Sequence, residues 1–143
     1  MIDMHDDLEI TNIMVAVDGS DNSRRAGDYA IKLGLELHAN IVALHVVPSG
    51  KPFPEKNLEK GTNHDYAYLD KLGKQSISAG VNLEIEIITA ESPVVNEIVK
   101  YANRKNIDLI VIGIRSVSEF RFMLGSTATG VVETARCPVL VVK

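Results

Sequence analysis

Residues 13–47 read IMVAVDGSDNSRRAGDYAIKLGLELHANIVALHVV, and this stretch decides the fold. It begins and ends on continuous apolar runs, at residues 13–17 and 41–47, which are typical of strands buried on both faces. Between them, residues 23–37 follow a turn signal in which Ser20 can cap a helix. Strand, helix and strand in this order predict a right-handed parallel crossover. The apolar residues at helical spacing, expected to face inward, are Ala26, Ala30, Leu33 and Leu37.

The remainder of the chain continues the alternation of strands and helices. Residues 81–89 alternate polar and apolar side chains, as an edge strand with one solvated face does. Residues 108–112 and 139–142 are short apolar runs and are predicted as buried strands. Three further helices are predicted. The first extends from about residue 66 to 79 and turns Leu69, Leu72 and Ile77 inward. The second has Ser92 as its cap and Pro93 as its first residue and ends near residue 106, and the third covers residues 126–135.

These elements predict one α/β domain at residues 13–143. It is a single-domain open parallel five-stranded sheet with helices on both faces, a Rossmann-like arrangement. Residues 1–12 are expected to form a flexible acidic tail. Residues 48–65 hold three prolines and two glycines among charged residues, and we expect a mobile loop there. Residues 113–125 are also predicted as loop.

Composition excludes several classes of function. The 143 residues carry 15 basic and 19 acidic side chains, so a net charge of −4 offers no field for nucleic acid or an anionic membrane. No run of 18 apolar residues is present, and the first residues lack the pattern of a secretory signal. The single cysteine fits a reducing compartment. We therefore expect a cytoplasmic protein that uses neither a membrane nor nucleic acid as a partner.

The segment from Gly113 to Ser126 is the strongest candidate for a site. Gly113 lets the backbone leave a strand tightly and approach a ligand. Gly125 and Ser126 begin a helix, whose first N–H groups and dipole together suit an anion, phosphate above all. The hydroxyls of Ser126 and Thr127 add donors, and Arg115 can supply a charged contact. The same residue types are also common in turns and caps that bind nothing.

Asp18 follows the first predicted strand and reaches the same edge of the sheet. A carboxylate there repels phosphate, so it suits a ribose hydroxyl or a metal ion, Mg²⁺ accompanying a nucleotide being the candidate. The alternative is a turn-forming aspartate with no ligand. His45 lies within an apolar strand and is interpreted as a hydrogen-bonded core histidine. No Ser-His-Asp or Cys-His spacing is present, and neither GxxxxGK nor GxGxxG occurs.

The chain resembles the universal stress protein family, also called UspA-like. The matching pieces follow the family order and extend from residue 13 to the end of the chain. They are IMVAVDGSDNSRRA at residues 13–26, ALHVV at 43–47, DLIVIG at 108–113, LGSTA at 124–128 and CPVLVV at 137–142.

This resemblance implies a fold and a ligand. The fold is similar to the adenine nucleotide alpha-hydrolases, with strand order 3-2-1-4-5. Family members form homodimers, often through the last strand, here Val139–Val142. Part of the family binds ATP through a loop of the form G-x2-G-x9-G-S/T. Carried over residue by residue, the resemblance implies that Gly113, Arg115, Ser116, Gly125, Ser126 and Thr127 belong to this loop, that Asp18 holds the ribose, and that Ala16 and Val46 line the adenine.

The loop departs from the family form at two points. Ser116 stands where the second glycine is expected, and eight residues rather than nine separate it from Gly125. A serine is tolerated at a negative φ and not easily at a positive one. The chain thus resembles a variant of the ATP-binding subgroup, between the family members that bind ATP and those that lack the glycines of this loop.

Two functions follow from these observations. The first is a homodimeric regulatory module of the stress response that binds ATP, ADP or AMP. The alternative is a dimeric protein-interaction module that binds no nucleotide. We expect no dedicated catalysis, and at most slow ATP hydrolysis, because no general base or phosphate-binding lysine is evident.

Overall fold

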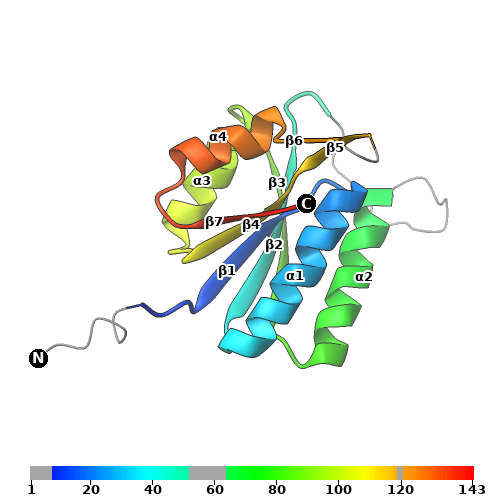
Figure 1. Ribbon diagram of the computed structural model, residues 1–143, viewed down its shortest axis with the longest axis vertical. Coiled ribbons are helices and arrows are strands. Elements are labelled where there is room, and N and C mark those ends of the chain that lie inside the picture. The colour runs from blue at the N-terminus through cyan, green and yellow to red at the C-terminus, as the bar shows by residue number, and fades with distance from the viewer. Residues whose placement is uncertain (1–7, 52–63, 119–120) are drawn as a thin grey trace, which may run out of the picture.

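The computed structural model describes residues 8–51, 64–118 and 121–143, and its centre is one parallel sheet (Figure 1). The strands lie in the order β3-β2-β1-β4-β7, which confirms the expected 3-2-1-4-5 arrangement. All neighbouring strands of this sheet run parallel. Their bounds are β1 (Asn12–Ala16), β2 (Asn40–Val47), β3 (Leu83–Thr89), β4 (Leu109–Gly113) and β7 (Val139–Val142).

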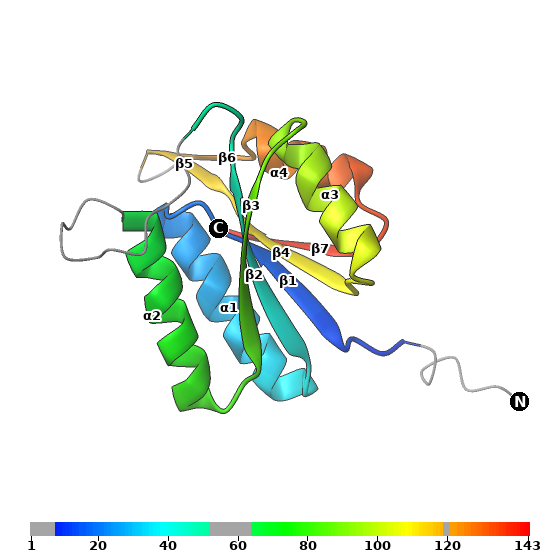
Figure 2. The same ribbon diagram turned by 180° about the vertical axis from the view of Figure 1, so that it is seen from behind.

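Four helices cover the two faces of the sheet, as predicted. They are α1 (Asp21–Leu37), α2 (His64–Ala79), α3 (Val94–Arg104) and α4 (Ser126–Thr134). Figures 1 and 2 show α1 and α2 on one face and α3 and α4 on the other. Among the described helices, none is both long and apolar enough to cross a bilayer.

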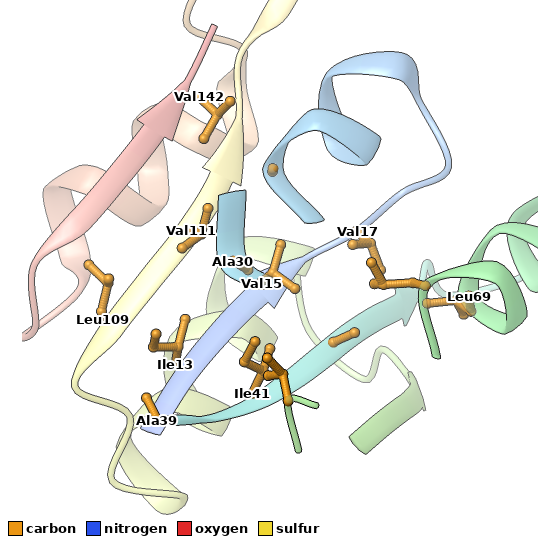
Figure 3. Packing of buried hydrophobic residues seen from close by; sticks show 14 of the residues in the cluster. Ile13, Val15, Val17, Ala30, Ala39, Ile41, Leu69, Leu109, Val111 and Val142 are labelled. Atoms are coloured by element: carbon orange, nitrogen blue, oxygen red, sulfur yellow. The ribbon is translucent and has the colours of Figure 1, made fainter. Parts of the chain in front are cut away.

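The alternation of side chains along the strands divides the core into two layers. In β1, Ile13 and Val15 point towards α1 and α2, and Met14 points towards α3 and α4. All three are fully buried. Figure 3 shows the first layer, where Val15 and Val111 from neighbouring strands lie beneath α1. Burial on both faces explains why these strands read as continuous apolar runs.

Two inward positions predicted on the helices are wrong. Leu37 is 42% exposed and Ile77 is 80% exposed. The small residues Gly27 and Gly34 are buried in α1 instead, and Tyr68 and Ser76 are buried in α2. The inner faces of these helices are made partly of small and polar residues, because α1 packs closely against its neighbours; a Cβ on Gly34 would collide with Ile41. Counting apolar residues therefore misplaced the end of each face.

The predicted start of α3 is also corrected. Pro93, rather than Ser92, occupies the cap position, and it makes no side-chain cap hydrogen bond. Ser92 instead donates through Oγ to Glu97 Oε1 at 2.5 Å, and its backbone N–H donates to the same oxygen at 3.1 Å. A first-turn glutamate thus reaches back to the residues before the helix and accepts from their backbone N–H groups.

The segment predicted as loop after β4 contains a hairpin. Strands β5 (Arg115–Ser118) and β6 (Arg121–Met123) pair antiparallel in a second, two-stranded sheet. The mobile loop expected at residues 48–65 falls largely on 52–63, outside the described residues, and its end is helical because α2 begins at His64. Residues 1–7 of the expected tail lie outside them too.

Candidate functional site

The carboxyl edge of the sheet brings together the ends of β1, β2 and β4. Ala16, at the end of β1, lies between Leu44 of β2 and Ile112 of β4. Val46 is two residues further along β2, is buried, and pairs with Ile88 of β3. In parallel sheets this edge is where ligands bind.

Asp18 forms the turn that joins β1 to α1. Its Oδ1 accepts a hydrogen bond from the Ser20 N–H at 2.9 Å, and Gly19 between them has a φ of 85°. The Ser20 hydroxyl accepts from the Ser23 N–H at 3.2 Å and caps α1, as predicted. Asp18 therefore stabilises this turn through its side chain. Its side chain is also exposed, so the carboxylate is accessible from solvent.

Gly113 is in close contact with the first turn of α1. A Cβ atom at this position would lie 2.6 Å from the Asn22 carbonyl oxygen and 3.0 Å from the Ser23 nitrogen. Ser23 in turn accepts a hydrogen bond through Oγ from the Asp18 N–H at 3.0 Å. The absent side chain at Gly113 thus makes room for the protein's own backbone, and Asp18 and Gly113 are joined through one helix turn.

The beginning of α4 differs from that of α1 in its capping. Gly125 is the cap residue, with φ −63° and ψ 167°, and as a glycine it has no side chain that could cap the first turn. Ser126 is exposed and Thr127 is half-buried. The first N–H groups of a helix have no partner within the helix. Figure 1 shows α4 beginning at the carboxyl edge of the sheet, on the opposite face from α1.

The hairpin carries the two remaining predicted positions. Arg115 and Ser116 lie in β5, and Ser116 pairs with Phe122 of β6. An extended strand residue has a negative φ, which serine adopts without strain, so this position does not require the glycine of the family form. The pairing shifts register between Ser116 and Ser118.

Tyr68 is a residue near this edge that the sequence did not single out. Its hydroxyl donates to the Ser23 carbonyl at 3.3 Å, and the Arg24 guanidinium carbon lies 5.5 Å from its ring centre. Burial, with the negative charges of Asp28 and Asp18, raises the pKa of Tyr68 far above its ordinary value. Its spacing of four residues before Leu72 was the signal that would have placed it on the inner face of α2.

The remaining titratable side chains show whether a metal ion could bind in this region. His45 is buried with Nδ1 2.9 Å from the Val17 carbonyl oxygen, which confirms the hydrogen-bonded core histidine. Within residues 8–51, 64–118 and 121–143, no three His, Cys, Asp or Glu side chains gather as metal ligands would. A Mg²⁺ ion at Asp18 would therefore need its other ligands from phosphate oxygens and water.

Comparison with known proteins gives a consistent picture. The model of the universal stress protein family matches residues 9–143. Universal stress protein MJ0531 of Methanocaldococcus jannaschii is 35% identical over 92% of this chain and 81% of its own length. The structure of universal stress protein UspA from Lactobacillus plantarum, 30% identical, matches 94% of this chain and 99% of that chain with a TM-score of 0.73.

Some of the solved relatives carry a nucleotide. One of these is a universal stress protein in complex with cAMP, 25% identical, with a TM-score of 0.68 over 94% of this chain and 97% of that chain. The TM-scores of 0.73 and 0.68 show that these two relatives share the fold of this chain. The family match spans the whole sheet, both helical layers and the edge that carries Asp18, Gly113 and Gly125. The chain therefore belongs to the universal stress protein family.

Proposed function

We propose that this protein binds an adenine nucleotide at the carboxyl edge of the sheet and acts as a regulatory module in the stress response. The observation that carries the proposal is the contrast between two helix starts. The Ser20 side chain caps α1, whereas no side chain caps α4 at Gly125. The uncapped N–H groups and the dipole of α4 suit a phosphate. A cAMP-bound relative of the same fold supports the choice of an adenine nucleotide.

Each predicted residue has a role in this proposal. The exposed Asp18 carboxylate accepts from ribose hydroxyls while its Oδ1 keeps the turn. The ends of β1 and β2, at Ala16 and Val46, flank the adenine. Phosphate groups lie against the start of α4. The residues proposed to surround the phosphates are Gly113, Arg115, Ser116, Gly125, Ser126 and Thr127.

The nucleotide is proposed to be ATP, ADP or AMP, with Mg²⁺ present where there are enough phosphates. As the alternative to its ribose contact, Asp18 would be the one protein ligand of that ion, since Mg²⁺ usually binds through one or two carboxylates together with substrate phosphates and water. The ion would neutralise phosphate charge. The nucleotide itself is held by the helix start and by hydrogen bonds to the ribose.

The proposal is tested by nucleotide-dependent thermal stability. A ligand that binds the folded state at 100 times its Kd stabilises it by about 2.7 kcal/mol. We expect ATP, ADP or AMP to raise the Tm of the protein at millimolar concentration. Gly125→Asp places a carboxylate cap where the phosphate would lie, so it is expected to stabilise α4 and abolish the shift. Gly125→Asn, a cap of the same size without charge, is expected to weaken binding less.

A second substitution tests the ribose contact separately. Asp18→Asn keeps an oxygen that can accept from the Ser20 N–H, so the turn and the Tm without nucleotide should change little. Binding should weaken by about tenfold, because a hydrogen bond to a charged group is lost. An unchanged Tm with every adenine nucleotide in the unsubstituted protein would contradict the proposal and favour the interaction module that binds no nucleotide.

We also propose that the protein is a homodimer joined through β7. Among the described strands, β7 pairs only with β4, so its other edge carries unpaired backbone groups. The Ile110 N–H donates to the Pro138 carbonyl, and the Ile114 N–H donates to the Val142 carbonyl. Because successive residues of a strand turn their backbone groups to opposite sides, the Val141 N–H faces away from β4. Val141→Pro removes that donor and is tolerated at an edge. Light scattering should show a dimer that becomes a folded monomer in this variant; a monomer before substitution would refute the contact.

A further inference from the structure

A hollow lies at the amino edge of the sheet, at the opposite end of the strands from the proposed nucleotide site. Its volume is about 230 Å³, and it is lined by the starts of β1, β2 and β3 and by the end of α3. Figure 2 shows α3 and α4 to one side of β2 and β3, so that none of the described helices covers the starts of these two strands on this face. The hollow is smaller than the usual 300–1,000 Å³ of drug-sized ligand sites, which favours a small ligand.

Tyr101 of α3 supplies a hydroxyl group that points to a ligand here. The side chain is only 4% exposed and lines the hollow. Its hydroxyl makes no hydrogen bond to any described residue, and among those residues no side-chain oxygen is both enclosed and unpartnered. The hydroxyl therefore reaches solvent, and Tyr101 is among the residues that line the hollow. A buried tyrosine usually has a hydrogen-bond partner for its hydroxyl, and a ligand in the hollow would supply one.

The electrostatic character of the hollow is negative. Glu84 and Glu86 are two residues apart in β3, so they project from the same face, and both line the hollow. Neither forms an ion pair with a described residue. After burial, which is the larger cause, their charges contribute to a raised pKa of Tyr101, and the charge of Arg104 opposes them. The Arg104 guanidinium carbon lies 5.4 Å from the centre of the Tyr101 ring, on the helix beside the hollow. Lys105 is the one cation among the lining residues, so two carboxylates face one ammonium group.

The remaining lining residues provide an apolar surface beside the charges. Val42 of β2 and Ile107, just after α3, are half-buried and pack against the core beneath α3. At the rim, Asn82 Nδ2 donates to Asn40 Oδ1 at 3.0 Å, which fixes the two amides. The hollow thus combines a short apolar surface with two carboxylates and a free hydroxyl.

From this juxtaposition we propose that the hollow binds a small aliphatic cation, a free primary amine or guanidine on a short hydrocarbon stem. The charged group lies between Glu84 and Glu86 and bonds to the Tyr101 hydroxyl, while the stem covers Val42 and Ile107. An anion is disfavoured by the two carboxylates. A metal ion is disfavoured because no third acidic, histidine or cysteine ligand of the described chain joins them. The site is independent of the nucleotide site at the other edge.

Titration of the isotopically labelled protein by NMR tests the proposal. We expect n-butylammonium and agmatine to cause saturable shifts of the amide signals of Val42, Glu84 and Tyr101 at constant ionic strength. The double variant Glu84→Gln/Glu86→Gln should weaken binding by at least about tenfold, because each lost charge removes a charged hydrogen bond. Tyr101→Phe should weaken it by about fivefold, and its fold should be unchanged because the hydroxyl has no partner to lose.

Controls separate charge recognition from general effects. Glu133→Gln removes the same charge from an exposed position on α4 and should leave binding unchanged. Three outcomes would each overturn the proposal. They are NMR shifts of equal size with n-butanol or butyrate, equally tight binding of the amines by the double variant, and the absence of any saturable shift. A lysine side chain of a partner protein carries the same chemistry; tighter binding of a blocked Gly-Lys-Gly peptide than of n-butylammonium would overturn the free amine as ligand.

Discussion

The carbonyl oxygen of Asn22, in the first turn of α1, lies 2.6 Å from the point that a Cβ atom on Gly113 would occupy. This close approach joins the start of a helix to the end of the neighbouring central strand. It places the Asp18 turn, the capped start of α1 and the exit from β4 in one rigid unit. The geometry of the carboxyl edge therefore depends on a missing side chain.

Gly113→Ala is expected to destabilise the protein by about 1–3 kcal/mol, because the obstacle is backbone and cannot rotate away. Gly73→Ala is the matched control. A Cβ there would meet only Ile85 Cδ1 at 3.5 Å, and alanine favours a helix by about 0.5–1 kcal/mol over glycine. Urea denaturation of both variants should move the midpoint in opposite directions. Equal midpoints would show that α1 shifts freely against β4.

Tyr68→Phe is expected to change the response of stability to alkaline pH. The raised pKa of Tyr68 means that the folded state keeps the phenol proton more tightly than the unfolded state. The stabilisation is fully present below the ordinary tyrosine pKa of about 10 and is lost as the pH rises towards the folded value. The Tm of the unsubstituted protein should fall more steeply above pH 10 than that of Tyr68→Phe, which costs about 1 kcal/mol at neutral pH. Tyr29→Phe, at an exposed position on α1, should leave the pH profile unchanged.

Ser92→Ala should destabilise the protein at neutral pH and have no effect in acid. The hydrogen bond from Ser92 Oγ is the main reason that the pKa of Glu97 lies below its ordinary value. A lowered pKa gives stability that is present above the ordinary glutamate pKa and lost as the pH falls through the folded value. Thermal unfolding from pH 7 to pH 2.5 should show the two Tm curves converging. Ser78→Ala, at an exposed position on α2, should give parallel curves.

Asp108→Asn should loosen the start of β1. One oxygen of Asp108 accepts from the Thr11 N–H, the Asn12 N–H and the Thr11 hydroxyl, at 2.9–3.0 Å. Although partial burial opposes it, these donors hold the pKa of Asp108 below its ordinary value. We expect a loss of about 1 kcal/mol at pH 7 by urea denaturation, since the site is partly solvated. Asp70→Asn, which breaks only the surface pair with Lys74, should cost less.

The parts of the fold that the sequence predicts well are those where one physical signal dominates. Residues 13–17 and 108–112 are buried on both faces, so their apolar runs identify strands without ambiguity. The hairpin was missed because residues 115–123 have neither an apolar run nor a two-residue turn signal. Ile77 was misplaced because an apolar residue near a helix end need not face the core.

The candidate site shows the same division. Ser20 as the cap of α1 follows from a local pattern, and the structure confirms it. The contact between Asn22 and Gly113 does not, since it joins residues that are far apart in the chain and depends on backbone positions. The hollow around Tyr101 was also beyond sequence reasoning, because its walls come from three strands and one helix.

The hairpin between β4 and α4 has a consequence for how a binding motif is counted. The chain leaves the sheet after Gly113 and reaches α4 at Gly125, and the segment between them pairs with itself, with a register shift between Ser116 and Ser118. An excursion of this kind can lose a residue by re-pairing, while its two anchor points stay where β4 and α4 hold them. The number of residues between two motif positions gives the length of the loop that connects them. The places of Gly113 and Gly125 themselves are set by β4 and α4. Relatives that differ in loop length can thus present the same anchors.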